Sequence, residues 1–163
     1  MCKEGITLNR IDLLINVLDS TYDKESWYAP LKNAIEGITA EQATWKPNGE
    51  ATKTIWENVN HLIYYKERLV ANMEGREWPH NLDGDQTFYL TDQSKEEQDW
   101  KKVVDRVEIA HNSLRDLLSK TSIEELDKNS LESKLLDIFL HDAYHTGQII
   151  QIRKMQGLWP SHR

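Results

Sequence analysis

The sequence predicts an all-α protein, a four-helix bundle in which residues 1–163 form a single domain. Apolar residues recur at spacings of three, four and seven through four long segments, which is the period of an amphipathic helix. No segment shows the alternation of apolar and polar residues that a half-buried strand requires. Four helices of roughly 15–25 residues, joined by loops, account for nearly the whole chain.

The first helical segment extends over about residues 7–21. It continues, or restarts, at Ser26, so that Pro30 falls in a first turn, where a missing N–H does least harm. Thr39-Ala-Glu-Gln42 has the spacing of a capping box and predicts a short helical turn, which a Lys-Pro-Asn-Gly sequence then ends.

A second capping box, Thr54-Ile-Trp-Glu57, starts a long helix that ends near Gly75. A loop follows over residues 76–93, and its length is unusual for a compact domain, where long loops are often functional. Ser94-Lys-Glu-Glu97 has the spacing to cap the third helix. The apolar stripe of that helix contains Trp100, Val104, Val107, Leu114 and Leu118.

Residues 122–130 are polar and are expected to form a connection. The fourth helix extends over about residues 133–156 and stops at Gly157, with Pro160 just beyond. This helix is apolar most of the way round, so we expect it to be buried. One side of the helix carries Ile138, Ile149 and Ile152. Another side carries Leu136, Phe139, Ala143 and Ile150.

The composition excludes several classes of function. Twenty basic against 27 acidic residues give a net charge of −7, which argues against a nucleic-acid partner and an anionic membrane surface. No run approaches the roughly 18–20 apolar residues of a membrane helix, and the first residues do not resemble a signal peptide. The single cysteine, Cys2, cannot form an internal disulfide, so a reducing cytoplasm is the simplest compartment.

Two of the six histidines, His141 and His145, have a spacing that suits a metal site. A separation of four places them one turn apart on the same side of the fourth helix. Imidazole suits zinc, nickel, copper or iron, and two imidazoles at this spacing can share one ion. The alternative is that both rings are hydrogen-bonded to carbonyls or to helix neighbours.

A third ligand must come from another helix, and periodicity leaves two candidates. His61 lies on the flank of the second helix, more than about 100° from its apolar stripe, so it is either a surface residue or a ligand that faces a cleft. His111 lies in the centre of the third helix's stripe and is expected to be a core residue. His80 and His162 have no organising neighbours and are expected to be solvated.

The sequence His141-Asp-Ala-Tyr-His145 differs from the His-Glu-x-x-His motif of zinc proteases in one position. Asp142 replaces the glutamate that acts as general base there and is one methylene shorter, which argues against a protease. We expect Asp142 on the helix surface or beside the metal ligands.

Three segments resemble the DinB-like superfamily. Thr54-Ile-Trp-Glu-Asn-Val-Asn-His61-Leu and Phe139-Leu-His141-Asp-Ala-Tyr-His145-Thr-Gly-Gln148-Ile look like the two signature helices of that family. Ala40-Glu-Gln-Ala-Thr-Trp45-Lys-Pro47 is similar to the link between its first and second helices. The resemblance spans most of the chain.

This resemblance implies a four-helix bundle with up-down-down-up connections, in which residues 76–93 cross over between helices. It implies a divalent metal ion, zinc or nickel, held by His61, His141 and His145, with water at the open coordination position. It thus favours His61 over His111 as the third ligand. It also implies a homodimer.

The better understood members of this family are metal-dependent transferases and isomerases that use low-molecular-weight thiols such as bacillithiol, mycothiol or glutathione. The resemblance therefore implies a thiol (S-)transferase that acts on a small electrophile, bound under residues 76–93, where Trp78, Phe88 and Tyr89 are candidates for a pocket wall. Two alternatives stay open: a metal-dependent hydrolase that uses metal-bound water, and a non-catalytic bundle that the metal stabilises.

Overall fold

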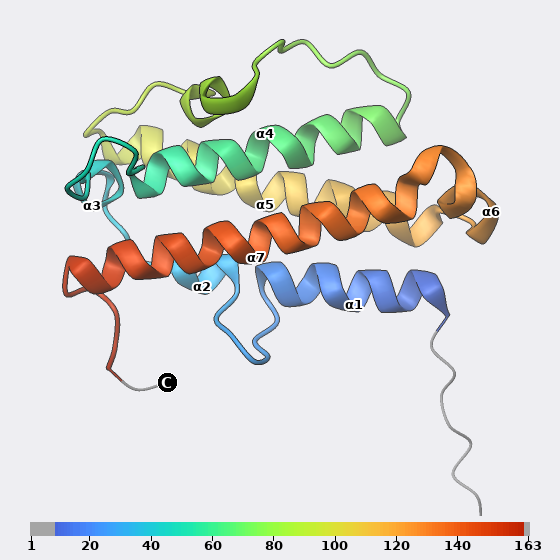
Figure 1. The fold of residues 1–163 in the computed structure, drawn as a ribbon, viewed down its shortest axis with the longest axis horizontal. Helices are drawn as coiled ribbons and strands as arrows, with labels where there is room; N and C mark the ends of the chain where they lie inside the picture. The colour runs from blue at the N-terminus through green and yellow to red at the C-terminus, as the bar shows by residue number, and fades with distance from the viewer. Residues whose placement is uncertain (1–8, 162–163) are drawn as a thin grey trace, which may run out of the picture.

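The computed structural model describes residues 9–161, and every regular element within that range is helical. The prediction of an all-α protein is therefore confirmed. None of these helices is both long and apolar enough to cross a membrane. Figure 1 shows the long rods of the bundle, which are α1 (Arg10–Tyr22), α4 (Ile55–Met73), α5 (Glu97–Lys120) and α7 (Leu131–Met155).

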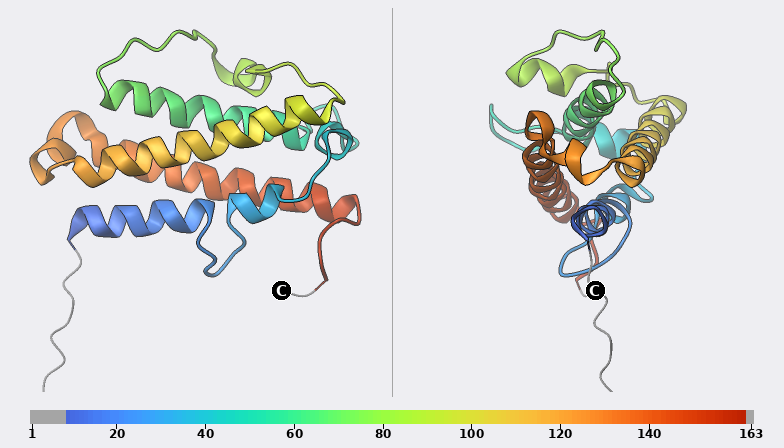
Figure 2. Two further views of the ribbon diagram at one scale, coloured as in Figure 1. Left: turned by 180° about the vertical axis from the view of Figure 1, so that it is seen from behind. Right: turned by 90° about the vertical axis from the view of Figure 1, so that its right-hand side faces the viewer.

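The helices α4 and α5 run side by side in the same direction, opposite to α1 and α7 (Figures 1 and 2). Near their starts Trp56 packs against Trp100, with ring centroids 5.2 Å apart, and farther along Glu67 binds Arg106 at 2.6 Å. The order of directions along the chain is therefore up, down, down, up. Because two successive helices are parallel, the chain between them has to return along the length of α4.

Residues 76–93 make this return, and we call them the crossover segment. They contain the short 3₁₀ helix η1 (Gly84–Tyr89), which lies over α4 in Figure 1. Side chains of α4 hold the segment in place: Asn60 donates to the carbonyls of Phe88 and Thr91, the Tyr64 hydroxyl to the carbonyl of Leu82, and the Trp56 indole to the Thr91 hydroxyl. Packing between helices and the cover of the crossover segment together bury 14 of the 19 residues of α4, including polar ones that face this segment.

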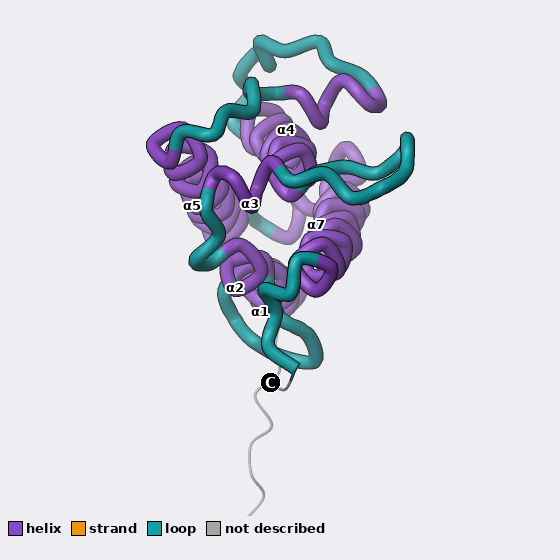
Figure 3. Tube along the Cα trace, turned by 90° about the vertical axis from the view of Figure 1, so that its left-hand side faces the viewer, coloured by secondary structure: helices purple, strands orange, loops and turns teal. Residues whose placement is uncertain are grey.

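Two short helices complete the chain before α4. The helix α2 (Leu31–Ile35) continues the line of α1, and α3 (Ala40–Thr44) lies across one end of the bundle, as the view in Figure 3 shows. The predicted capping boxes of Thr39 with Gln42, and of Thr54 with Glu57, are both confirmed at the starts of α3 and α4.

The expected helix start at Ser26 is wrong, because the chain is not helical again until Leu31. Pro30 occupies the N-cap of α2 with an extended backbone and does not lie within a first turn. The physical reason is that a proline disfavours helical dihedrals in the residue before it.

The capping box expected at Ser94 is also wrong, since α5 begins at Glu97 with Glu96 at its N-cap. The Ser94 hydroxyl donates to Asp99 and accepts from the backbone N–H of Glu96. The Glu97 carboxylate accepts instead from the backbone N–H of Ala40, so a tertiary contact takes the side chain that a capping box would use.

The end of the chain differs from expectation in two places. Residues 122–130 are not only a connection, because they contain the short helix α6 (Ile123–Asp127), which Ser122 and Glu125 cap. The long helix α7 is not buried all round, because its outer side exposes three large apolar side chains spaced four apart. These are Leu136 at 44%, Leu140 at 71% and Tyr144 at 67% exposure.

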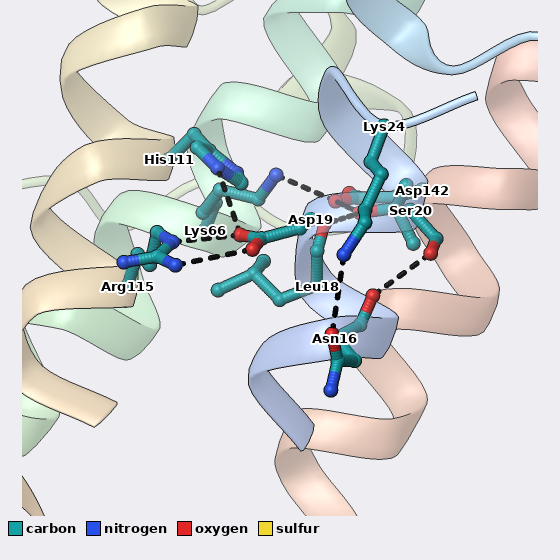
Figure 4. A network of polar contacts seen from close by, with 10 residues as sticks. Asn16, Leu18, Asp19, Ser20, Lys24, Lys66, His111, Arg115 and Asp142 are labelled. Atoms are coloured by element: carbon teal, nitrogen blue, oxygen red, sulfur yellow. Dashed lines mark hydrogen bonds and ion pairs between the residues drawn. The ribbon is translucent and has the colours of Figure 1, made fainter. Parts of the chain in front are cut away.

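An ion pair lies in the interior between α4 and α7 (Figure 4). The ammonium of Lys66 is 2.5 Å from the carboxylate of Asp142, and both side chains are at most 3% exposed. The hydroxyl of Thr21, on α1, approaches the same carboxylate at 3.5 Å. The expectation that Asp142 lies on the helix surface is therefore wrong, because it faces inward and joins three helices. Its charge still acts on His141, the neighbouring histidine.

We expect the substitution Lys66→Met to destabilise the fold by about 3–5 kcal/mol, because it leaves the Asp142 carboxylate buried without a counter-charge. The double variant with Asp142→Leu should recover most of this loss. Urea unfolding at neutral pH measures both changes. Lys101→Met, which breaks an exposed pair with Asp105, is the matched control and should cost less than about 1 kcal/mol. An equal loss in Lys66→Met and this control would contradict the assignment.

Candidate metal centre

The structure brings His61, His141 and His145 together. One ring nitrogen of each lies within 4.8 Å of the others, and the Nε2 atoms of His61 and His141 are 2.9 Å apart. Two of the rings come from successive turns of α7, as their spacing predicts, and the third comes from α4, which packs against it.

His61 is buried, at 8% exposure, although it lies on the flank of α4 away from the apolar stripe. The crossover segment explains this, because the ring of Phe88 stacks on His61 with centroids 4.0 Å apart and planes 7° from parallel. Helical periodicity registers packing between helices only, so it cannot distinguish a solvated flank from one that a loop covers.

Thr87 determines which nitrogen of His61 carries a proton. Its hydroxyl donates to the carbonyl of Gly84 at 2.7 Å and thereby uses its only proton. The contact between this hydroxyl oxygen and His61 Nδ1, at 2.5 Å, therefore requires Nδ1–H to donate. The lone pair of His61 is then on Nε2, which faces the other two rings.

Asn58 has the same effect on His145. The Asn58 amide donates to the carbonyl of Thr54 at 2.8 Å, which turns its oxygen toward His145 Nδ1, also at 2.8 Å. His145 Nδ1–H must donate to this oxygen, which leaves a lone pair on Nε2. Hydrogen bonds of this kind orient the histidines of protein metal sites and fix their tautomer.

Burial keeps the three rings neutral. Burial, together with the smaller effect of the neighbouring histidines, lowers the pKa of His61 to about 3 and that of His145 to about 4. It also lowers the pKa of His141. Metal ions bind the neutral form of imidazole. A divalent cation therefore fits this donor set, because no charged ring has to lose a proton first.

A pocket of about 630 Å³ lies beside the centre, and His61 and His141 form part of its wall. Trp78 of the crossover segment and Tyr65 of α4 line it as well. The rings are thus covered by Phe88 on one side and accessible from the pocket on another. Catalytic metal sites keep such an open side, whereas structural sites are closed.

His111 lies apart from the three histidines, as expected of a core residue. It is buried and stacks on Tyr22 with centroids 4.2 Å apart. Burial lowers its pKa to about 3, so its contact with Asp19 at 3.8 Å is not an ion pair at neutral pH. Asp23 lies close by, but Arg115 already binds the Asp19 carboxylate at 2.8 Å.

The remaining candidates from the sequence have different positions. His80 is exposed, as expected, and its ring contacts Trp78. Of the three proposed wall residues, Trp78 lines the pocket and Phe88 covers His61, whereas Tyr89 is 57% exposed and lies against Lys53. His162 and Cys2 lie outside the described residues.

Sequence reasoning missed the roles of Asn58 and Thr87. Asn58 precedes His61 by one helical turn on the same flank of α4, which is a signal that could have identified it. Nothing in the sequence indicates Thr87, because it reaches His61 only through the path of the crossover segment.

A model of the DinB superfamily matches residues 25–149, most of the chain. The chain belongs to the DinB superfamily. The matched region of this DinB-superfamily protein contains all three histidines and the crossover segment. Searches of curated proteins and of solved structures gave no match.

We expect Asn58→Leu and Thr87→Val each to weaken the binding of zinc or nickel by about 10–100-fold, because each removes the acceptor that orients a histidine. Competition with a chromogenic chelator measures the affinity. Asn112→Leu, at an exposed position of α5, is the control and should leave the affinity unchanged. Wild-type affinity in both of the first two variants would show that these hydrogen bonds do not tune the site.

Proposed function

We propose that this protein is a divalent-metal-dependent thiol transferase of the reducing cytoplasm, in which His61, His141 and His145 hold zinc or nickel. The observation that carries the proposal is the convergence of three neutral imidazoles, two of which line an accessible pocket. A divalent cation at such a site lowers the pKa of a thiol that binds it and so supplies a thiolate nucleophile at neutral pH.

The side chains around the centre orient the metal ligands and shield one face of the centre from water. Thr87 and Asn58 hold two of the rings, and Phe88 covers the face of His61. The small electrophile occupies the pocket beside His141. In the transfer, the thiol loses its proton to solvent, the sulfur forms a bond to the electrophilic carbon, and the leaving group departs with the electrons of the broken bond.

The structure favours this proposal over a purely structural metal because it offers no fourth protein ligand among the candidates from the sequence. A closed site needs such a ligand, and those candidates are Glu57 and His111. The carboxylate of Glu57 is already bound by the backbone N–H of Thr54 and by Gln93. Neither residue belongs to the group of ligand atoms around His61.

We expect His61→Ala, His141→Ala and His145→Ala each to abolish stoichiometric metal binding, because each removes one of three ligands. Elemental analysis after loading with zinc or nickel and removal of loosely bound ions measures this. His80→Ala, an exposed histidine, is the control and should retain about one metal per chain. Stoichiometric metal in the first three variants would refute the ligand assignment.

The activity itself is tested on the metal-loaded protein with a panel of low-molecular-weight thiols and a chromogenic aryl halide. A transferase consumes thiol and electrophile together, and His61→Ala should abolish the turnover. Turnover of an ester or amide without any thiol would favour the hydrolase. Metal binding without either activity, together with a large loss of stability on metal removal, would favour the stabilised bundle.

We also propose that the protein forms a homodimer. The exposed row of Leu136, Leu140 and Tyr144 on α7 supports this. We expect sedimentation to give twice the chain mass for the wild type. Leu140→Glu should shift the mass toward the monomer, because it places a charge in an apolar contact. Leu13→Glu, at an exposed leucine of α1, is the comparison. A monomeric wild type would contradict this part.

A further inference from the structure

The pocket beside the histidine centre is basic, although the protein as a whole is acidic. Its wall carries Arg68, Arg76 and Lys134 against a single carboxylate, Asp137. The chain has a net charge of −7. Cations therefore gather in a pocket from which a substrate could approach the histidines.

Two of these cations are free to bind a ligand. Arg76 is held by Glu74 at 2.6 Å, but neither Arg68 nor Lys134 has a hydrogen-bond or ion-pair partner among residues 9–161. Every other arginine in that range is hydrogen-bonded to a carboxylate or a carbonyl, as the bonds of Arg10, Arg76, Arg106, Arg115 and Arg153 show. Arg68 is thus the exception, and it lines the pocket.

Each of the two free cations lies seven residues along its helix from one of the histidines. Arg68 follows His61 by seven residues on α4, and Lys134 precedes His141 by seven residues on α7. Because the two helices are antiparallel, both cations are displaced toward the same end of the pocket. Seven residues of helix correspond to about 10 Å, which sets the length of a ligand that reaches both points.

The charge balance favours a carboxylate. With Arg76 neutralised by Glu74, the two free cations exceed Asp137 by one positive charge, which matches a single negative charge on the ligand. A phosphate dianion would carry more charge than the wall compensates and would be repelled by Asp137. A guanidinium also binds the two oxygens of a carboxylate with parallel hydrogen bonds.

We propose that the substrate of this pocket is a small molecule with a carboxylate about 10 Å from its reacting atom. Arg68 and Lys134 bind the carboxylate, and the reacting end lies at His61 and His141. The chemistry at the reacting end rests on the proposed thiol transfer, whereas binding of the carboxylate does not.

The test is therefore made on the metal-free protein, so that it is separate from metal loading and turnover. Hexanoate, its neutral amide hexanamide and inorganic phosphate are titrated while the indole N–H resonance of Trp78, in the pocket wall, is followed by NMR. We expect hexanoate to shift this resonance saturably and to bind at least about tenfold more tightly than hexanamide, because charged hydrogen bonds add to the affinity.

Substitutions in the pocket wall test which side chains bind the carboxylate. Arg68→Gln and Lys134→Gln should each weaken hexanoate about tenfold and leave hexanamide unchanged, whereas Asp137→Asn should strengthen hexanoate. Lys101→Gln, an exposed lysine of α5, is the control and should have no effect. Equal binding of hexanoate and hexanamide, or unchanged hexanoate binding in both glutamine variants, would overturn the proposal. Tighter binding of phosphate than of hexanoate, lost in Arg68→Gln, would replace the carboxylate with a phosphate group.

Discussion

The parallel arrangement of α4 and α5 is the constraint on which the rest of the structure depends. It obliges the chain to return along α4, and the returning segment covers a flank that helix packing leaves open. Hydrogen bonds from Asn60 and Tyr64 hold this cover in a defined position. A polar flank of one helix, with His61 on it, thereby becomes the interior of a site.

The buried polar side chains of α4 are stable in this interior because they have partners, as Asn60, His61 and Lys66 show. The Lys66–Asp142 pair joins α4 to α7 on one side of the helix, while His61 faces the crossover segment on another. Burying such groups costs free energy unless hydrogen bonds or counter-charges compensate. The same partners also orient side chains, so the polar interior specifies how α4 and α7 are placed relative to each other.

The centre combines a closed side with an open one, which is the arrangement that catalytic metal sites have in common. Phe88, Thr87 and Asn58 restrain the rings from the closed side. On the open side the pocket is lined by charged groups as well as by the imidazoles of His61 and His141. Membership of the DinB superfamily fits such a centre, but the orientation of its rings follows from residues outside the histidine pattern.

The sequence by itself determined the elements that local rules govern: the all-α class, the capping boxes at Thr39 and Thr54, and the pairing of His141 with His145 on one helix face. It could not decide whether His61 is covered or solvated, because that depends on a segment 15 or more residues away along the chain. The inward direction of Asp142 and the role of Thr87 were likewise settled only by tertiary contacts. Helical periodicity describes one helix at a time, whereas burial on a flank depends on which distant segment covers it.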